Sequence, residues 1–252
     1  MKINIYLVLQ WQDLLLLRDL LRLPVRKGAV CYLHGATGKG NDQIRFELTI
    51  KALAPDIKII APWRDSNWKL QSREDEIEYC RQHGIHLPFS TDCSYSRDRN
   101  IWHISHEGLE LEDPANEPNY KHLLVLGCTP EEAPDEPEYV TMTFEKGVPK
   151  SVNGKAMKVS DIIRELNRLG AKHGIGIIDI VENRVVGMKS RGVYETPGGT
   201  ILYEAHQQLE ELVLDRDTTT FKMDVGNKFA QVVYEGKWET PLREALQAFV
   251  EK

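Results

Sequence analysis

Residues 35–42 constrain this chain more than any other segment, because three glycines alternate there with polar side chains. Glycine lets the backbone approach a ligand closely, and the N-terminus of a following helix offers free amide groups to an anion. An apolar run at residues 29–33 precedes the segment. The helical pattern at residues 43–53 follows it, and we expect Ile44 and Leu48 to face inward there. This order predicts a ligand site at the carboxyl end of a strand in an open α/β sheet, although a simple glycine-rich turn would also explain it.

The glycine-rich segment is not a Walker A loop. That loop requires G-x-x-x-x-G-K followed by Ser or Thr, whereas Gly35 and Gly38 are too close together and a glycine follows Lys39. Asn41 and Arg45 are four residues apart, so both side chains can project from one side of the start of the helix. The segment therefore favours a binding site for a small polar or anionic ligand over the phosphate-binding loop of a P-loop enzyme.

A second strand and a second helix follow. Residues 57–61 are an apolar run that, like the first, predicts a buried strand. Residues 72–83 form a charged helical pattern with Ser72 as N-cap, Asp75 three residues later and Gly84 as C-cap. The alternation of strands and helices predicts a parallel sheet with crossover helices.

The rest of the chain favours an antiparallel α+β arrangement. We expect residues 85–135 to be rich in loops, and the acidic, proline-broken stretch at 130–137 to be an exposed connector. The Asn153-Gly154 dipeptide predicts a hairpin. The other predicted elements are strands at residues 138–146 and 174–181 and helices at residues 160–169, 200–213 and 241–250.

A second polar cluster surrounds residues 187–199, which we interpret as a glycine-punctuated loop after a strand. A carboxylate such as Glu182 can hold an ammonium group, and the hydroxyl of Tyr194 can orient a ligand. With Lys189 and Arg191 nearby, these groups suit a small zwitterion. An internal salt-bridge network between Glu182 and the neighbouring basic residues explains them equally well.

Composition excludes several classes of protein. The chain has 32 basic and 38 acidic residues, a net charge of -6, which argues against a general nucleic-acid binder. Its four cysteines form no CxxC pair. His103 and His106 are spaced like a pair of metal ligands, but a single polar loop explains them more simply, so we expect neither a metal site nor a disulfide framework. Residues 5–17 are too short and too polar to span a bilayer, so we expect a cytoplasmic protein without membrane contact.

The leucine-dense segment 1–27 predicts a helix that ends at Pro24.

Several long motifs together resemble the argininosuccinate synthase family. They are His34-Gly-Ala-Thr-Gly-Lys-Gly-Asn-Asp-Gln-Ile-Arg-Phe-Glu47, Ala61-Pro-Trp-Arg64, Ala133-Pro-Asp-Glu-Pro-Glu138, Phe144-Glu-Lys-Gly-Val-Pro149, Ile180-Val-Glu-Asn-Arg184, Gly187-Met-Lys-Ser-Arg-Gly-Val-Tyr-Glu-Thr-Pro197 and Leu214-Asp-Arg216. The resemblance extends from about Gly28 to Lys252.

The resemblance implies an α/β fold in two parts. The first is the remnant of a parallel-sheet nucleotide-binding domain of the adenine nucleotide α-hydrolase type, and the second is an α+β synthetase domain. The implied division is a segment outside the family at residues 1–27, the C-terminal part of the nucleotide-binding domain at 28–92, and the synthetase domain at 93–252. The synthetase domain would bind citrulline and aspartate and carry the oligomer contacts.

The resemblance also implies an activity, which is the ATP-dependent joining of citrulline to aspartate through a citrullyl-adenylate. It implies ATP with Mg²⁺ and a homotetrameric assembly. Gly35 would approach ATP, and Thr37, Asn41 and Asp42 would hold aspartate. The implied citrulline contacts are Asn41, Arg45, Ser96, Ser105, Glu182 and Tyr194. The motifs assign no catalytic residue and no metal ligand.

The chain also departs from the family pattern. It lacks the Ser-Gly-Gly-x-Asp-Thr-Ser loop that cradles the ATP phosphates and the Leu-Gly-Thr-Ser-Leu-Ala-Arg-Pro segment that helps bind citrulline, and Ile177 replaces the usual arginine. We therefore expect a truncated chain that is inactive alone. Two alternatives stay open: a non-catalytic subunit of the full-length enzyme, and an unrelated P-loop-like hydrolase, which the missing Ser or Thr after Lys39 disfavours.

Overall fold

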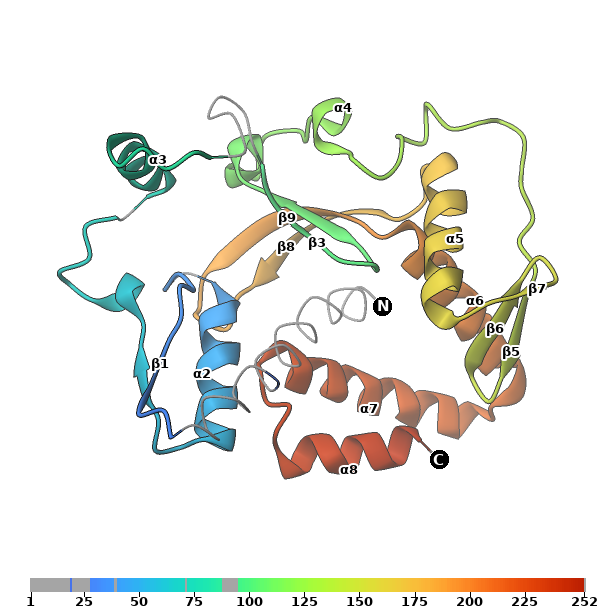
Figure 1. Ribbon diagram of the computed structural model, residues 1–252. Helices are drawn as coiled ribbons and strands as arrows, with labels where there is room; N and C mark the ends of the chain where they lie inside the picture. Colours follow the sequence, from blue (N-terminus) through green and yellow to red (C-terminus); the bar gives the residue numbers. More distant parts are fainter. Residues whose placement is uncertain (1–18, 20–27, 39, 71, 88–94, 252) are drawn as a thin grey trace. The chain divides into compact units, whose positions relative to one another are not determined.

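The computed structural model (Figure 1) describes residues 19, 28–38, 40–70, 72–87 and 95–251, apart from the side chain of Arg73. The chain divides into two compact units. The first unit contains residues 1–94, 183–188 and 222–252, and the second contains residues 95–182 and 189–221. The helix predicted within residues 1–27 and the boundary predicted between residues 92 and 93 lie outside the described residues.

The first unit contains the predicted parallel strands. Strand β1 (Cys31–Leu33) pairs with β2 (Lys58–Ile60) in parallel, and helix α2 (Asn41–Leu53) is the crossover between them. A small core forms where Ile50 of α2 packs with Ala54 and Ile57 and with Tyr32 of β1. This arrangement confirms the predicted strand-helix-strand order.

The burial of these elements differs from the prediction. The strands are not buried on both faces, because Leu33 is 63% exposed. The expectation that Leu48 faces inward is wrong, since its side chain is 41% exposed. The buried positions of α2 are mainly polar: Asn41, Gln43, Arg45, Thr49 and Ile50. Long-range polar contacts of Asn41 and Arg45 stabilise the first part of this face, and Ile50 packs into the small apolar core.

Helix α3 (Arg73–Gln82) has the predicted caps. The Ser72 hydroxyl accepts from the backbone amide of Asp75, and the Asp75 carboxylate accepts from the amide of Ser72, which completes a capping box. Gly84, with φ of 66°, follows the last turn in a left-handed conformation. The short 3₁₀ helix η1 (Pro62–Arg64) precedes α3 in the same unit.

Two C-terminal helices complete the described parts of the first unit. Helix α8 (Pro241–Val250) has the predicted bounds, and Thr240 caps it. Helix α7 (Arg216–Tyr234), which the sequence interpretation did not identify, is 19 residues long and belongs to this unit from Lys222 onward. Its end is a Schellman motif, in which the amide of Lys237 bonds the carbonyl of Val232 and that of Gly236 bonds the carbonyl of Val233.

The second unit is built on a sheet with the strand order β3-β4-β9-β8. Its members are β3 (Ser96–Arg99), β4 (Ile104–Glu107), β8 (Ile177–Asn183) and β9 (Lys189–Glu195). One correction concerns the expected loop at 187–199, most of which is strand β9 and the start of a helix. The described part of residues 85–135 is rich in loops, as predicted, but it also contains β3 and β4, which the sequence did not indicate. All four residues of β3 are exposed, so its sequence shows no apolar alternation that could reveal a strand.

A second, smaller sheet in this unit confirms the predicted hairpin. Strands β5 (Met142–Glu145), β6 (Val148–Val152) and β7 (Lys155–Ala156) are antiparallel. Asn153 and Gly154 form the β6–β7 turn with φ angles of 48° and 77°, the left-handed values that such a tight turn requires.

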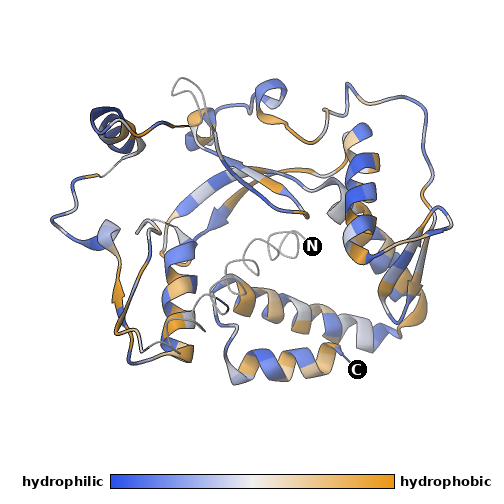
Figure 2. Ribbon diagram, in the orientation of Figure 1, coloured by the Kyte–Doolittle hydropathy of each residue, from blue (hydrophilic) through white to orange (hydrophobic). Residues whose placement is uncertain are grey.

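Helices α5 (Val159–Lys172) and α6 (Pro197–Val213) pack with this small sheet. Val152 of β6 joins Ile162, Leu166 and Leu169 of α5 in one buried cluster, against which Ile201 of α6 packs. Figure 2 shows polar and apolar bands alternating along α5, as expected of an amphipathic helix. The short helices η2 (Leu109–Glu112) and α4 (Tyr120–Leu123) lie in the connection between β4 and α5. Within the described residues no helix has the length and apolar character needed to cross a membrane.

Candidate functional site

The first group of predicted site residues surrounds the start of α2. Gly35 and Thr37 are exposed in the loop after β1, and a Cβ added to Gly35 would meet no atom within 4 Å. The N-cap of α2 is Gly40, which has no side chain to accept from the first-turn amides. The Asp42 side chain is 59% exposed beside these amides. An exposed loop and an exposed carboxylate therefore lie next to a helix N-terminus that no side chain caps, a combination suited to a small charged ligand.

Asn41, by contrast, is buried and fully engaged within the first unit. Its Nδ2 atom donates to the hydroxyl of Tyr234 at 2.7 Å, and its Oδ1 atom accepts from the amide of Val185 at 2.8 Å. The same hydroxyl donates to the backbone carbonyl of Asn183 at 3.1 Å. Asn41 thus links the start of α2 to the end of α7 and to residues 183–185.

Arg45 is buried against the same tyrosine. Its Nε atom donates to the Tyr234 carbonyl at 3.2 Å, its guanidinium lies 5.5 Å from the ring centroid, and its Nη1 atom pairs with Asp42 at 3.1 Å. Only 5% of the Arg45 side chain is exposed. Gly236 makes this close packing possible, since a Cβ there would lie 2.8 Å from the Cα of Arg45. The sequence interpretation missed Tyr234, because a contact across 189 residues leaves no local signal.

The second group of predicted site residues lies in the sheet of the second unit. Ser105 of β4 is directly opposite Tyr194 of β9 and opposite Asp98 of β3, so these three residues share one face of the sheet. Ser96, two residues before Asp98, is on that face as well. Ser105 and Tyr194 are buried, whereas Ser96 is exposed. Glu182 is in β8, the strand next to β9, and is half-buried.

A buried histidine lies beside Tyr194. The His103 ring is fully buried and its centroid is 5.8 Å from that of Tyr194. Burial lowers the pKa of His103 to about 4, so the ring is neutral at physiological pH. Within the described part of the chain, neither ring nitrogen of His103 has a hydrogen-bond partner, and neither does the hydroxyl of buried Thr196. Buried polar atoms without hydrogen-bond partners are costly and rare in proteins. Their presence close to Tyr194 is therefore an unusual feature of this end of the sheet.

Arg191 is part of an internal network. Its guanidinium forms a two-point ion pair with Asp179 of β8, at 3.0 and 2.8 Å, and also donates to the carbonyls of Asp113 and Asn116. The hydrogen-bonded carboxylate of Asp179 raises the pKa of Arg191 above its ordinary value. Of the two interpretations of the second polar cluster, the structure supports the internal network for Arg191, with Asp179 as its partner in place of Glu182.

The structure thus assigns the predicted site residues to two places. Gly35, Thr37, Asn41, Asp42 and Arg45 belong to the first unit, and Ser96, Ser105, Glu182 and Tyr194 belong to the second. Asn41 and Arg45 meet at Tyr234, and Ser105 and Tyr194 meet across two strands. No cluster of three or more His, Cys, Asp or Glu side chains suited to a metal ion occurs in the described ranges.

Two family models match this chain. Residues 12–86 match the model described as "Arginosuccinate synthase N-terminal HUP domain", and residues 95–252 match "Arginosuccinate synthase C-terminal domain". The first match begins at residue 12, so it extends into the segment 1–27 that we expected to lie outside the family.

Curated relatives agree with these matches. The chain is 94% identical over 238 residues to the argininosuccinate synthase of Lachnospira eligens, an alignment that covers 94% of this chain and 58% of the relative. It is 79% identical over 234 residues to that of Agathobacter rectalis, with coverage of 93% and 57%. The chain therefore spans slightly more than half the length of these relatives.

Proposed function

Because this chain belongs to the argininosuccinate synthase family, we propose that the protein to which it belongs joins citrulline to aspartate at the expense of ATP. The single observation that carries the proposal is the 94% identity to the argininosuccinate synthase of Lachnospira eligens over 238 residues. The N-terminal match to a HUP domain is consistent with ATP as the third substrate.

The proposed reaction has two steps. The ureido oxygen of citrulline attacks the α-phosphorus of ATP, which forms citrullyl-AMP and releases pyrophosphate. The amine of aspartate then attacks the activated carbon, expels AMP and yields argininosuccinate. Both steps depend mainly on the alignment of charged reactants and on stabilisation of the developing charge.

The residue roles that the family resemblance implies agree with the chemistry of the ligand groups. Arg45 suits a substrate carboxylate and Glu182 a substrate ammonium, while Asp42 suits the aspartate amine before that amine attacks. Thr37 and Asn41 add polar contacts to aspartate, and Gly35 allows ATP to approach the backbone. Support comes from the exposure of Asp42 beside the uncapped first turn of α2.

The citrulline contacts on the sheet complete the proposed roles. They are Ser96, Ser105 and Tyr194, with Asn41 and Arg45 from α2. Support comes from the shared face of the three sheet residues, because hydroxyl groups on one face can act on one ligand. We further propose that Mg²⁺ arrives with the ATP phosphates, that the protein is cytoplasmic, and that it assembles as a homotetramer.

A pyrophosphate-release assay tests the function. The chain is first completed with the residues of the Lachnospira eligens relative that lie outside the match. With ATP, citrulline and aspartate together, we expect continuous release of pyrophosphate and the appearance of argininosuccinate by mass spectrometry. Without aspartate, release should stop at one equivalent per site. The 252-residue chain alone, which lacks the Ser-Gly-Gly-x-Asp-Thr-Ser motif, should release none.

Two outcomes of the same assay would contradict the proposed function. Turnover of ATP by the completed protein without citrulline, or release of inorganic phosphate in place of pyrophosphate, would indicate a nucleotide hydrolase and overturn the proposal.

A further inference from the structure

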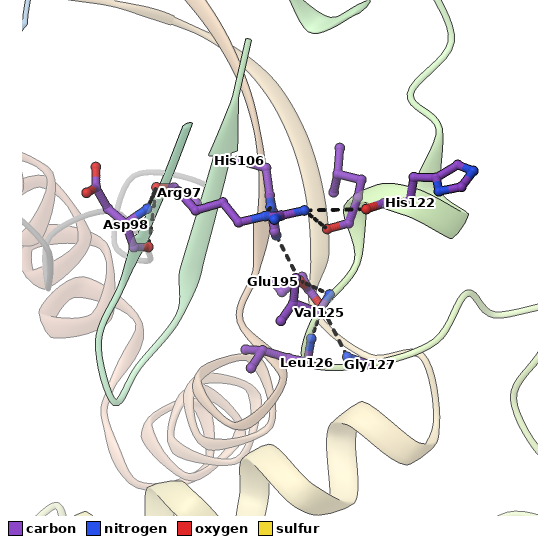
Figure 3. A network of polar contacts seen from close by, with 10 residues as sticks. Arg97, Asp98, His106, His122, Val125, Leu126, Gly127 and Glu195 are labelled. Carbon is purple, nitrogen blue, oxygen red and sulfur yellow. Dashed lines mark hydrogen bonds and ion pairs between the residues drawn. The ribbon is translucent and has the colours of Figure 1, made fainter. Parts of the chain in front are cut away.

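A chain of polar contacts, which begins at the exposed Arg97 and continues through two buried side chains, crosses the sheet of the second unit (Figure 3). Arg97 of β3 donates from Nε to Nδ1 of His106 in β4 at 3.0 Å. Nε2 of His106 in turn lies 2.8 Å from Oε1 of Glu195 in β9. His106 is completely buried and Glu195 is 2% exposed. Three neighbouring strands are therefore connected through side chains as well as through their backbones.

The contacts define the protonation of each member. An arginine can only donate, so Nδ1 of His106 must accept, and the ring proton is on Nε2, which donates to Glu195. Glu195 also accepts from the backbone amides of Val125, Leu126 and Gly127, at 2.8, 2.8 and 3.0 Å. Burial raises the pKa of Glu195, but the bonds from His106 and the three amides outweigh it and lower the pKa overall, so the carboxylate is ionised.

The network also anchors a connecting segment. Figure 3 shows the amides of residues 125–127 converging on the Glu195 carboxylate. At the other end, the Arg97 guanidinium donates to the carbonyls of His122 and Leu123 at 3.4 and 3.5 Å. One end of the network thus holds the last two residues of α4 and the other holds residues 125–127 just after it, so a shift of this part of the chain would be transmitted to the three strands.

The position of the network in the strands is informative. Arg97 follows Ser96, His106 follows Ser105, and Glu195 follows Tyr194. Successive side chains in a strand point to opposite faces of the sheet. The side chain of each network residue and that of the residue before it therefore lie on opposite faces. Those three residues of the opposite face are the ones assigned to citrulline under the proposed function.

We propose that Arg97, His106 and Glu195 are positioning residues that hold Ser96, Ser105 and Tyr194 in register for the citrulline substrate. They do not touch the substrate themselves. The inference depends on the proposed function and adds to it the part of the fold that maintains the geometry of the citrulline site. Small displacements of groups that orient a reactant are costly, because alignment supplies much of the rate.

The test uses three variants of the completed protein. His106→Phe keeps a ring but removes both hydrogen bonds, whereas His106→Gln offers one donor and one acceptor in their place. His173→Phe is the matched control, since His173 bonds Glu138 through Nε2 at 3.0 Å on the surface of the same unit. The measurements are the KM values for citrulline and for ATP, with thermal unfolding as the check of folding.

We expect His106→Phe to raise the citrulline KM about tenfold and the ATP KM less than about twofold. His106→Gln should stay within about threefold of the wild type for citrulline, and His173→Phe should leave both KM values unchanged. If His106→Phe does not fold, Arg97→Met, which removes only the outer donor, replaces it with the same expected selectivity for citrulline.

Three results would overturn the positioning role: a folded His106→Phe protein with a wild-type citrulline KM, equal increases for citrulline and ATP, or a folded His106→Gln protein as impaired as His106→Phe. An inactive wild-type protein would be a different failure. It would refute the proposed function first, and the positioning role with it.

Discussion

Nδ2 of Asn41 donates to the hydroxyl of Tyr234 at 2.7 Å, and this one hydroxyl donates onward to the carbonyl of Asn183. Tyr234→Phe removes both bonds while the ring keeps its contact with Arg45. We expect the free energy of unfolding to fall by about 1 kcal/mol and the KM for citrulline or aspartate in the completed protein to rise about fivefold, as measured by urea unfolding and initial rates.

Tyr139→Phe is the control for this change, because Tyr139 is 88% exposed. It should leave both the unfolding free energy and the KM values unaltered. A Tyr234→Phe protein that matched Tyr139→Phe in both measurements would show that the Asn41 bond has no role in binding.

Two glycines of the α7 region should respond to alanine with opposite signs. Gly236 has φ of 74°, and its added Cβ would lie 2.8 Å from the Cα of Arg45, so we expect Gly236→Ala to lower the free energy of unfolding by about 2 kcal/mol. Gly226 lies within the helix with no atom within 4 Å of an added Cβ, so Gly226→Ala should raise it by about 0.5–1 kcal/mol. Urea unfolding of both variants measures the difference; effects of the same sign would contradict the packing described around Arg45.

The stability of the second unit should depend on pH through His103. The folded pKa of His103 is lowered to about 4 by burial, below the unfolded value of about 6.5, so the unfolded chain binds a proton first as the pH falls. The stabilisation present above pH 6.5 is then lost progressively down to pH 4. Between pH 7 and pH 5 we expect His103 to account for a loss of about 2 kcal/mol, measured by urea unfolding at each pH.

His103→Phe is the comparison for this titration. The variant keeps a buried ring that cannot be protonated, so its loss of stability between pH 7 and pH 5 should be smaller than that of the wild type by the same amount. Parallel pH profiles for the two proteins would mean that His103 is solvated or paired in solution.

Glu182 is proposed to hold the citrulline ammonium, so its charge should matter more to citrulline than to ATP. We expect Glu182→Gln in the completed protein to raise the citrulline KM about tenfold or more and the ATP KM less than about twofold. Glu165→Gln, which removes an exposed ion pair with Arg168 on α5, should change neither. Equal losses for citrulline and ATP would exclude the ammonium role.

Local signals in the sequence predicted a large part of the fold. The capping box at Ser72, the Asn153-Gly154 turn and the strand order around α2 were all confirmed, because each depends on residues that are near one another in the chain. Helix α8 begins at Pro241, directly after its Thr240 cap, and was likewise confirmed.

The elements that were missed depend on distant contacts. Strand β3 is Ser-Arg-Asp-Arg, exposed at every position, and only its pairing with β4 makes it a strand. The buried side of α2 is polar because Tyr234 and Val185 satisfy Asn41 and Arg45, so a search for apolar periodicity selected Leu48 wrongly. Tertiary contacts override such patterns.

The residues of the candidate site also fall into those that the sequence identified and those that only the structure revealed. Motif resemblance supplied the residues assigned to ligands, and their roles stay predictions. The supporting residues Tyr234, His106 and Glu195 came only from the structure, because Asn41 is far from Tyr234 in the chain and His106 is far from Glu195.

A crystal structure of the completed protein with bound citrulline would test most directly whether one substrate draws on both groups of residues. We expect citrulline within hydrogen-bonding distance of Asn41 or Arg45 and, in the same complex, of Ser105 or Tyr194. Citrulline bound by only one of these groups, with the other facing solvent, would contradict the shared site on which the proposed ligation depends.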